Sequence, residues 1–471
     1  MERMNEEVAS TDRPPAPPAR DSGEEDLRRE QLARLREALE ADDRAAIEAL
    51  FAALHPADAA ELIELLDGDE RRHLARLMGG RIAPEILAEL DGTTLEELVA
   101  VLPERVVARA LAEMDTDDAI QFLEELDEDE QRRILARTAR RTRAEIESGL
   151  SFPEDSAGRL MRRDLVAMPE FWNVGQAIDF LRGLDAEEGP EEFYEIFVVN
   201  PQFRPVGTVP LWRLLRSPRP TPLKEIMTPD PPLFPVTTDQ EEVALAFTKY
   251  HLISAGVVDD NGRLIGRITA DDVVEVIGEE AEEDILALAG VSESDLNQPI
   301  REVTRERFIW LVINLGTAIL ASLVIGLFEA TIQQMVALAV LMPIVASMGG
   351  NAGTQTMTVT VRALATRELT ALNALKVARR ELLVAFLNGC LLALVTGAVT
   401  YVWFWNPMLA LVIGLAMVVN LVAAGLAGIF VPLALDRLGI DPAVASSVFV
   451  TTVTDVVGFF AFLALGGAIL L

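Results

Sequence analysis

The sequence predicts a multidomain membrane protein with an all-α helical-repeat N-terminal domain, an α/β tandem, and a polytopic α-helical membrane domain with five spans. Three observations predict it. The chain has 471 residues, more than one domain usually holds. The formal net charge is −33, yet six basic and six acidic residues balance from Phe308 to the C-terminus, so the excess charge lies in residues 1–307. The neutral part contains five long apolar stretches.

The acidic N-terminal region is expected to be helical after a short tail. Residues 1–28 are polar and rich in proline, which predicts a disordered tail without the apolar run of a signal peptide. Residues 29–153 contain short segments such as APEILAELDG, in which Leu, Ile and Ala recur at helical spacing. Asp-Gly and Leu-Pro pairs between them supply turns and helix ends. We predict a superhelix of loosely repeated helices, with an ordinary helical bundle as the alternative.

The pattern changes to alternating strands and helices in residues 154–278. A strand, a turn, a second strand and the start of a helix are predicted in FYEIFVVNPQFRPVGTVPLWRLL. The same order of elements is predicted again in ISAGVVDDNGRLIGRITADDVVEVI. Each copy follows a helix and an approach segment, so the region resembles a pair of CBS domains. The Asn-Gly in the second copy predicts a type I′ hairpin turn, and the first copy carries an EEGPEE insertion. Residues 279–307 then predict an acidic helix linking the pair to the membrane.

The apolar stretches set the membrane topology. They cover about 308–328, 335–361, 382–405, 408–435 and 443–471, long enough to cross a bilayer core as helices. Basic residues lie between the second and third stretches and between the fourth and fifth, but not in the other two loops. The positive-inside rule therefore predicts a plasma-membrane protein with a cytoplasmic N-terminus and an outside C-terminus.

Composition excludes several classes of function. The negative charge argues against nucleic acid, because duplex binding depends on neutralising phosphates with Lys and Arg. One cysteine and three histidines, none of the histidines after residue 252, cannot build a zinc site. An intramembrane enzyme would need a second deep carboxylate or a base, and the spans contain no His or Lys.

Asp455, in FVTTVTDVVGFF, is the acid expected deep within a span. A carboxylate at that depth costs about 3 kcal/mol on insertion scales, so a function or a partner must offset the cost. We interpret it as an ion site facing a water-filled pore. The alternative is a structural Asp held by hydrogen bonds from Thr451, Thr452 and Thr454.

The stretch PIVASMGGNAGTQ places polar residues in the second apolar stretch. Gly349, Gly350 and Gly353 are expected to let backbones approach closely, while Asn351 and Gln355 present amide oxygens to a wet interior. The alternative is a packing motif with amides bonded between helices. A pathway lined only by oxygen favours a hard cation, and Mg²⁺ suits a site with few carboxylates. Ca²⁺, Mn²⁺ and Co²⁺ remain open on this reasoning.

Together these features resemble the MgtE family of magnesium transporters and channels. The resemblance covers about residues 30–471, and rests on SFPEDSAGRLM, PIVASMGGNAGTQ, RALATREL, LGIDPA and TTVTDVVG. It implies a homodimeric, Mg²⁺-selective and Mg²⁺-gated pore whose cytoplasmic domains sense Mg²⁺. Asp455 and Asn351, with Gly350, match the family's pore positions. Ser447 stands where the family often has a second amide.

The resemblance also implies regulatory sites. Positions that match sensory Mg²⁺ ligands are Asp117, Asp239, Asp272, Glu275, Glu280, Glu283, Asp284 and Asp441, and Gln121 stands where a further N-domain acid can occur. Thr269 and Asp272 match a ribose-binding pattern, which implies ATP at the CBS pair. Solvated acidic faces are the alternative for these acids. A proton-coupled or less selective Co²⁺ or Mn²⁺ transporter, or a non-conducting nucleotide sensor, are the alternative functions.

Overall fold

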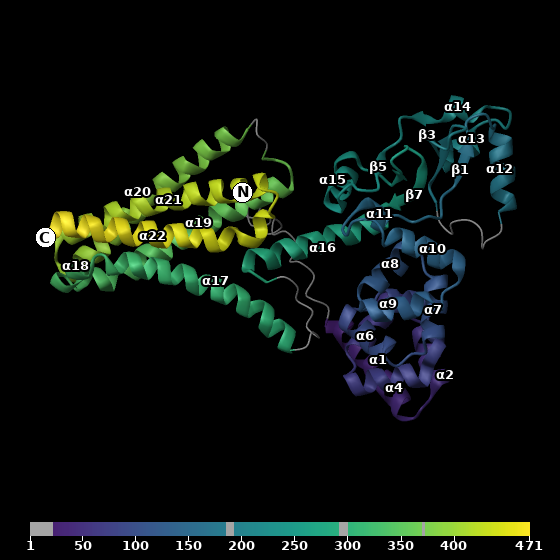
Figure 1. Cartoon of the computed structure of the whole chain (residues 1–471), viewed down its shortest axis with the longest axis horizontal. Helices are drawn as coiled ribbons and strands as arrows, with labels where there is room; N and C mark the ends of the chain where they lie inside the picture. Colours follow the sequence, from purple (N-terminus) through teal and green to yellow (C-terminus); the bar gives the residue numbers. More distant parts are fainter. Residues whose placement is uncertain (1–21, 185–192, 292–299, 370–372) are drawn as a thin grey trace, which may run out of the picture. The chain divides into compact units, whose positions relative to one another are not determined.

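The computed structural model describes residues 22–184, 193–291, 300–369 and 373–471. Residues 1–21 of the predicted tail and the EEGPEE insertion lie outside them. The prediction of a tail to residue 28 is wrong at its end, because residues 22–28 belong to the first turns of a helix that begins at Ser22. The chain forms two compact units, one ending at Asp272 and one running from Val273 to Leu471. Figure 1 shows the elements of both.

The N-terminal part of the first unit is a succession of short helices, as the periodicity predicts. They are α1 (Ser22–Glu40), α2 (Arg44–Phe51), α3 (Pro56–Glu64), α4 (Gly68–Met78), η1 (Gly79–Arg81), α5 (Pro84–Ala88), α6 (Gly92–Val99), α7 (Glu104–Glu113), α8 (Thr116–Glu124), α9 (Glu128–Leu135) and α10 (Arg140–Gly149). Their apolar faces share one core, which includes Leu35, Leu74 and Leu111. Asp67 caps α4 by accepting from the backbone N–H groups of Asp69 and Glu70.

The rest of the first unit is the predicted tandem of strands and helices. Its elements are α11 (Ala157–Leu160), β1 (Ala167–Pro169), α12 (Val174–Gly183), β2 (Glu195–Val199), β3 (Pro205–Pro210), α13 (Leu211–Arg216), α14 (Leu223–Ile226), β4 (Thr228–Pro229), β5 (Leu233–Pro235), α15 (Gln240–Tyr250), β6 (Ser254–Val258) and β7 (Leu264–Thr269). The strand orders are β1-β2-β3-β4 and β5-β6-β7. In each sheet the first pair is parallel and the hairpin after it is antiparallel, so the two copies share one topology.

The turn of the β6–β7 hairpin differs from the predicted type I′ geometry. Among its residues only Gly262 has a positive φ, of 72°. Asp259 accepts the backbone N–H of Asn261 at 2.8 Å and that of Arg263 at 2.9 Å through Oδ1. These side-chain bonds stabilise a turn in which Asn261 keeps a negative φ and only the glycine is left-handed.

The linking helix is not a separate element. Helix α16 (Ala270–Ala289) begins directly after β7 and runs through residue 278 without a break, so the predicted boundary at 278/279 falls inside it. The acidic run from Glu279 to Asp284 is the second half of this helix. Residues 292–299 of the predicted linker lie outside the described part.

The membrane part of the second unit contains α17 (Ile300–Gly326), the short α18 (Glu329–Gln334), α19 (Ala337–Ala365), α20 (Ala374–Phe404), α21 (Pro407–Arg437) and α22 (Pro442–Leu470). Of the described helices, all except α18 in this region are long and apolar enough to span a bilayer, five in total. Helix α21 packs against α19, α20 and α22. The five predicted spans are therefore confirmed by length and composition.

Candidate functional site: a pore lining and two acidic clusters

Helix α22 carries a polar stripe that includes Asp455. Ser447, Thr451 and Asp455 follow one another at intervals of four residues and are all half-buried, so they share one face of the helix. The helix starts at Asp441, whose carboxylate caps it by accepting the backbone N–H of Ala443 at 2.8 Å. The stripe thus runs from an acidic helix start into the apolar interior of the span.

The threonines around Asp455 bond to their own helix. The hydroxyls of Thr451, Thr452 and Thr454 donate to the carbonyls of Ser447, Val448 and Thr451 at 2.8, 2.6 and 2.9 Å, respectively. In the described part of the chain, no side chain donates a hydrogen bond to the Asp455 carboxylate. The structure therefore gives no support to a structural Asp held by these hydroxyls.

A second polar stripe lies on α19. The side chains of Ser347, Asn351, Thr354, Gln355 and Thr358 are all exposed on a single copy of the chain. They recur three or four residues apart, so they form one continuous face of a membrane-spanning helix. Polar groups at this depth need water or a protein partner, because lipid cannot satisfy their hydrogen bonds.

The glycines of the same helix play two different roles. A Cβ added at Gly349 would lie 2.1 Å from Asn420 Nδ2, and one at Gly353 would lie 2.6 Å from Val450. These two glycines therefore allow the close approach of α21 and α22 to α19. At Gly350 an added Cβ would meet nothing within 4 Å. The expectation that Gly350 serves close packing is wrong within one chain, because it faces the open side of the helix with Asn351.

The first acidic cluster surrounds Arg162, just after α11. Its guanidinium donates to Asp115 at 2.9 Å, Asp117 at 3.1 Å, Asp272 at 2.6 Å and, more weakly, Asp271 at 3.4 Å. Asp117 and Asp272 are the most buried of these carboxylates, with 11% and 4% of their side chains exposed. The predicted ligands Asp117 and Asp272 are thus brought together, but around an arginine.

Burial dominates the electrostatics of this cluster. It raises the pKa of the Asp117 carboxyl well above its ordinary value; Arg162 opposes this rise, while Asp118, Asp272 and Asp115 add to it. Burial disfavours the charge on the Arg162 guanidinium, but the surrounding carboxylates, Asp117 first, outweigh it and raise the pKa of that group. Asp117 Oδ1 is buried without a hydrogen-bond partner in the described structure.

Asp272 and Thr269, the predicted nucleotide pair, bind each other. Asp272 Oδ2 accepts the backbone N–H of Thr269 at 3.0 Å and its hydroxyl at 2.7 Å. Its other oxygen accepts from Arg162, and both residues are buried. Both oxygens of the Asp272 carboxylate therefore already accept hydrogen bonds within the chain, and the predicted contact of these two residues with ATP stays a prediction.

The second acidic cluster lies where α16 meets the membrane helices. Ala287 of α16 is buried in a small core with Met357, Val361, Ala443 and Val450. One turn earlier, burial raises the pKa of the Asp284 carboxyl, and the charge of Asp441 adds to the rise. Asp284 and Asp441 are thus close enough to repel each other where α16 packs against the start of α22.

The other predicted regulatory acids lie on α16 or at the start of α15. Glu275 and Glu283 are exposed on α16, and Glu280 is half-buried one turn before Asp284. Asp239 caps α15 by accepting the backbone N–H of Glu241 at 2.9 Å, which gives it a local structural role.

Comparisons with known proteins fit this arrangement. The MgtE family model, described as a divalent cation transporter, matches residues 342–465. The MgtE intracellular N domain matches 54–155, and the CBS domain matches 223–279. The magnesium transporter MgtE of Thermus thermophilus is 36% identical over 443 residues, which are 93% of this chain and 98% of the relative.

The chain belongs to the MgtE family. The magnesium transporter MgtE of Enterococcus faecalis is also similar, 31% identical over 66% of this chain and 68% of the relative. A crystal structure of the cytosolic domain of the Mg²⁺ channel MgtE in complex with ATP is 33% identical, covering 52% of this chain and 99% of that one with a TM-score of 0.48. The resemblance stated from the motifs is therefore confirmed.

Sequence reasoning missed one residue of the MgtE membrane core. Asn420 of α21 is fully buried, and its Nδ2 donates to the Val345 carbonyl of α19 at 2.8 Å. It fits between Gly349 and Gly458, where an added Cβ would lie 2.1 and 2.7 Å from the Asn420 amide. A lone Asn in the otherwise apolar run MVVNLVAAG was the available signal.

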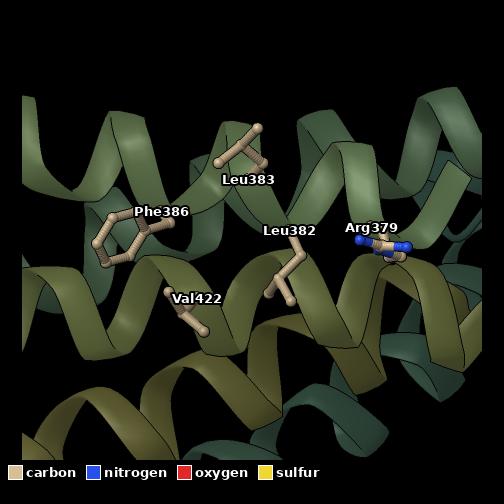
Figure 2. Close-up of a pocket in the computed structure, with 5 residues that line it drawn as sticks. All are labelled: Arg379, Leu382, Leu383, Phe386 and Val422. Atoms are coloured by element: carbon tan, nitrogen blue, oxygen red, sulfur yellow. The ribbon is translucent and has the colours of Figure 1, made fainter. Parts of the chain in front are cut away.

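A pocket on the membrane helices of this MgtE-family chain is not part of the site. It has a volume of about 390 Å³ and lies between α20 and α21, lined by Arg379, Leu382, Leu383, Phe386 and Val422. Figure 2 shows apolar side chains along it and the Arg379 guanidinium at one end. Its lining is mostly apolar, which suits hydrocarbon and not a hydrated cation.

Proposed function

We propose that this chain is a Mg²⁺-selective, Mg²⁺-gated transporter or channel of the plasma membrane. The observation that carries the proposal is the pair of polar stripes on α19 and α22, with the Asp455 carboxylate unbonded by described side chains at the depth of a span. The named relatives are magnesium transporters, which favours Mg²⁺ among the hard cations. The low number of carboxylates suits an ion that keeps part of its water shell.

The path is proposed to form between two copies of the chain. The stripe of α19 is exposed on one copy, and an exposed polar face in lipid would be unfavourable. A homodimer that faces the two stripes inward would line a wet pathway with Asn351, Ser447 and Asp455, and would leave room beside Gly350. Two Asp455 carboxylates would then attract a hydrated divalent cation electrostatically.

Gating is proposed to act through α16. Mg²⁺ bound near Asp284 and Asp441 would remove the repulsion between these carboxylates and hold α16 against the starts of the membrane helices. Glu280 and Glu283 are close enough along the helix to contribute further oxygen ligands. The acidic half of α16 would therefore act as a two-state element whose position is biased by the ion. By the positive-inside rule this end is cytoplasmic and the C-terminus is outside.

The experiment is Mg²⁺ flux into vesicles that contain the purified full-length protein. We expect flux into protein-containing vesicles above that into empty ones, and lower flux when Mg²⁺ is present on the side of the soluble domains. A dependence of flux on an imposed pH gradient would indicate the proton-coupled alternative. Comparable flux of Co²⁺ or Mn²⁺ would indicate a less selective transporter, and absence of any flux would leave a non-conducting sensor.

A further inference from the structure

A short segment after α10 fixes the CBS pair to the N-terminal helices through arginines. Arg159 forms an ion pair with Glu124 of α8. Arg162 binds Asp115 and Asp117 at the start of α8. Arg163 donates to the Ser148 hydroxyl of α10 at 2.7 Å. Three arginines within five residues therefore contact α8 and α10 of the N-terminal domain, two of them through carboxylates.

We call the contact between the N-terminal helices and the CBS pair at Arg162 the joint. All three nitrogens of the Arg162 guanidinium donate hydrogen bonds there. Its Nη1 binds Asp115, its Nε binds Asp117, and its Nη2 binds Asp272 and the more distant Asp271. The planar fork directs donors at fixed angles to carboxylates on both sides of the joint, a geometry that the compact ammonium of a lysine reproduces less well. A divalent cation at the predicted position would have to take the same oxygens of Asp117 and Asp272.

The main chain of Arg162 is fixed by β7. Its N–H donates to the Arg267 carbonyl at 2.8 Å, and the N–H of Arg267 donates back to the Arg162 carbonyl at 2.9 Å. Gly266 makes this approach possible, since an added Cβ there would lie 2.9 Å from the Arg162 carbonyl oxygen. The guanidinium is thus held at the cluster by a covalent tether, independently of any ion concentration.

We propose that Arg162 is the resident cation of this cluster and holds the N-terminal domain against the CBS pair without Mg²⁺. The joint is then closed at all Mg²⁺ concentrations, and Mg²⁺ sensing is left to the acids of α16 and the start of α22. Removing Arg162 would expose the carboxylates of Asp115, Asp117 and Asp118, whose oxygens lie within 4.8 Å of one another. Such a variant gains a dependence on Mg²⁺ that the native joint lacks.

The test is a spin-label distance across the joint in the full-length protein. With Cys390 replaced by Ala, labels are placed at Arg105→Cys on α7 and Thr248→Cys on α15, both exposed. The native joint should give one narrow distance distribution, the same with EDTA and with millimolar Mg²⁺. Arg162→Gln should lengthen and broaden the distribution in EDTA, and Mg²⁺ should restore it. Arg162→Lys should give an intermediate result in EDTA.

The matched control is Arg219→Gln, which removes an ion pair with Asp179 in the first CBS copy, away from the joint, and should leave the distances unchanged. Lengthening of the native distances in EDTA would overturn the proposal, and this measurement needs no substitution at Arg162. Unchanged distances in Arg162→Gln with EDTA would overturn it as well. The inference deepens the proposed regulation, but the distances do not depend on flux, so its failure and a failure of the transport proposal are distinguishable.

Discussion

The acidic cluster at Arg162 and the one at Asp284 and Asp441 both bring carboxylates close together. They differ in whether a basic side chain balances the negative charge. At the first, a guanidinium built into the chain binds Asp115, Asp117, Asp271 and Asp272. At the second, no Lys or Arg of the described residues forms an ion pair with either carboxylate. A carboxylate pair without a fixed cation responds to whatever cation the solution provides. The proposal that the second cluster senses Mg²⁺ therefore rests on the missing counter-charge and not on negative charge alone.

Asp455, in the proposed pore, is a further carboxylate that no Lys or Arg of the described residues pairs with, and its substitution should have the largest effect. Asp455→Ala should reduce Mg²⁺ flux to the level of empty vesicles, because it removes the fixed negative charge from the proposed path. Asp455→Asn should lose most of the flux, since the amide keeps the shape without the charge. The measurement is flux into proteoliposomes with equal amounts of folded protein.

The control for this prediction comes from the arginine-held cluster. Asp271 is 67% exposed and is the most distant partner of Arg162, so Asp271→Ala should leave flux near the native level. Native flux in Asp455→Ala would refute the pore assignment.

The acids of α16 should control inhibition and not conduction. Replacing Glu280, Glu283 and Asp284 together with Ala removes both the repulsion and the proposed ligands. The variant should conduct at Mg²⁺ concentrations that inhibit the native protein, and Mg²⁺ should no longer protect residues near Gly278 and Gly290 from proteolysis. The measurements are flux and limited proteolysis over a Mg²⁺ titration.

Two controls separate ligation from screening in this experiment. Glu282→Ala, an exposed neighbour on the same helix, should keep normal inhibition. NaCl at equal ionic strength should not protect the native helix, because screening weakens repulsion without bridging two groups. Protection by NaCl, or normal inhibition in the triple variant, would mean that the acidic run is a solvated face.

Protonation of Asp284 in the second acidic cluster should stabilise the packing of α16, as Mg²⁺ is proposed to do, but to a smaller extent. The pKa of Asp284 is raised by burial and then by Asp441, so its charged form is destabilised when α16 is packed. The free-energy cost of packing α16 with a charged Asp284 is absent below the ordinary carboxyl pKa and fully present above the raised pKa. Packing of α16 should therefore become more stable as the pH falls through this window, which hydrogen exchange of α16 in Mg²⁺-free buffer can measure.

The matched variant for the pH experiment is Asp284→Asn. It removes the charge while nearly preserving the shape of the side chain, so it should slow exchange of α16 at neutral pH and weaken the dependence on pH. If native exchange is independent of pH, or if the variant exchanges faster than the native protein at neutral pH, the raised pKa does not govern packing.

The sequence predicts the elements and their order well, because helical spacing, alternating strands and apolar length are local signals. It does not predict which side chains meet. Asp117 and Asp272 lie 45 and 110 residues from Arg162 along the chain, respectively, and no local pattern links them. The run of acids on α16 is visible in the sequence, but its pairing with Asp441 depends on how the helix packs. Asn420 was missed for the same reason, since its role is set by two glycines on other helices.

Gly349 and Gly350 are adjacent in the sequence, yet substitutions at the two positions should affect stability differently. These effects are local and smaller than those predicted above. The Cβ of Gly349→Ala would overlap the Asn420 amide, while that of Gly350→Ala has open space within the chain. Overpacking of this kind typically costs about 1–3 kcal/mol, so Gly349→Ala should lower the thermal stability of the detergent-solubilised protein. Gly350→Ala should leave that stability near the native value.

Mg²⁺ flux should also distinguish Gly350 from Gly349, because Gly350 is proposed to line the path beside Asn351. Gly350→Leu and Asn351→Leu should reduce Mg²⁺ flux without loss of stability, since a large apolar side chain would narrow and dry the pathway. Asn420→Ala serves as the complementary variant: it should relieve the clash in Gly349→Ala and so show non-additive stability with it. If Gly350→Leu destabilised the protein as Gly349→Ala does and left flux unchanged, the GGNAG face would be a packing surface and the path would lie elsewhere.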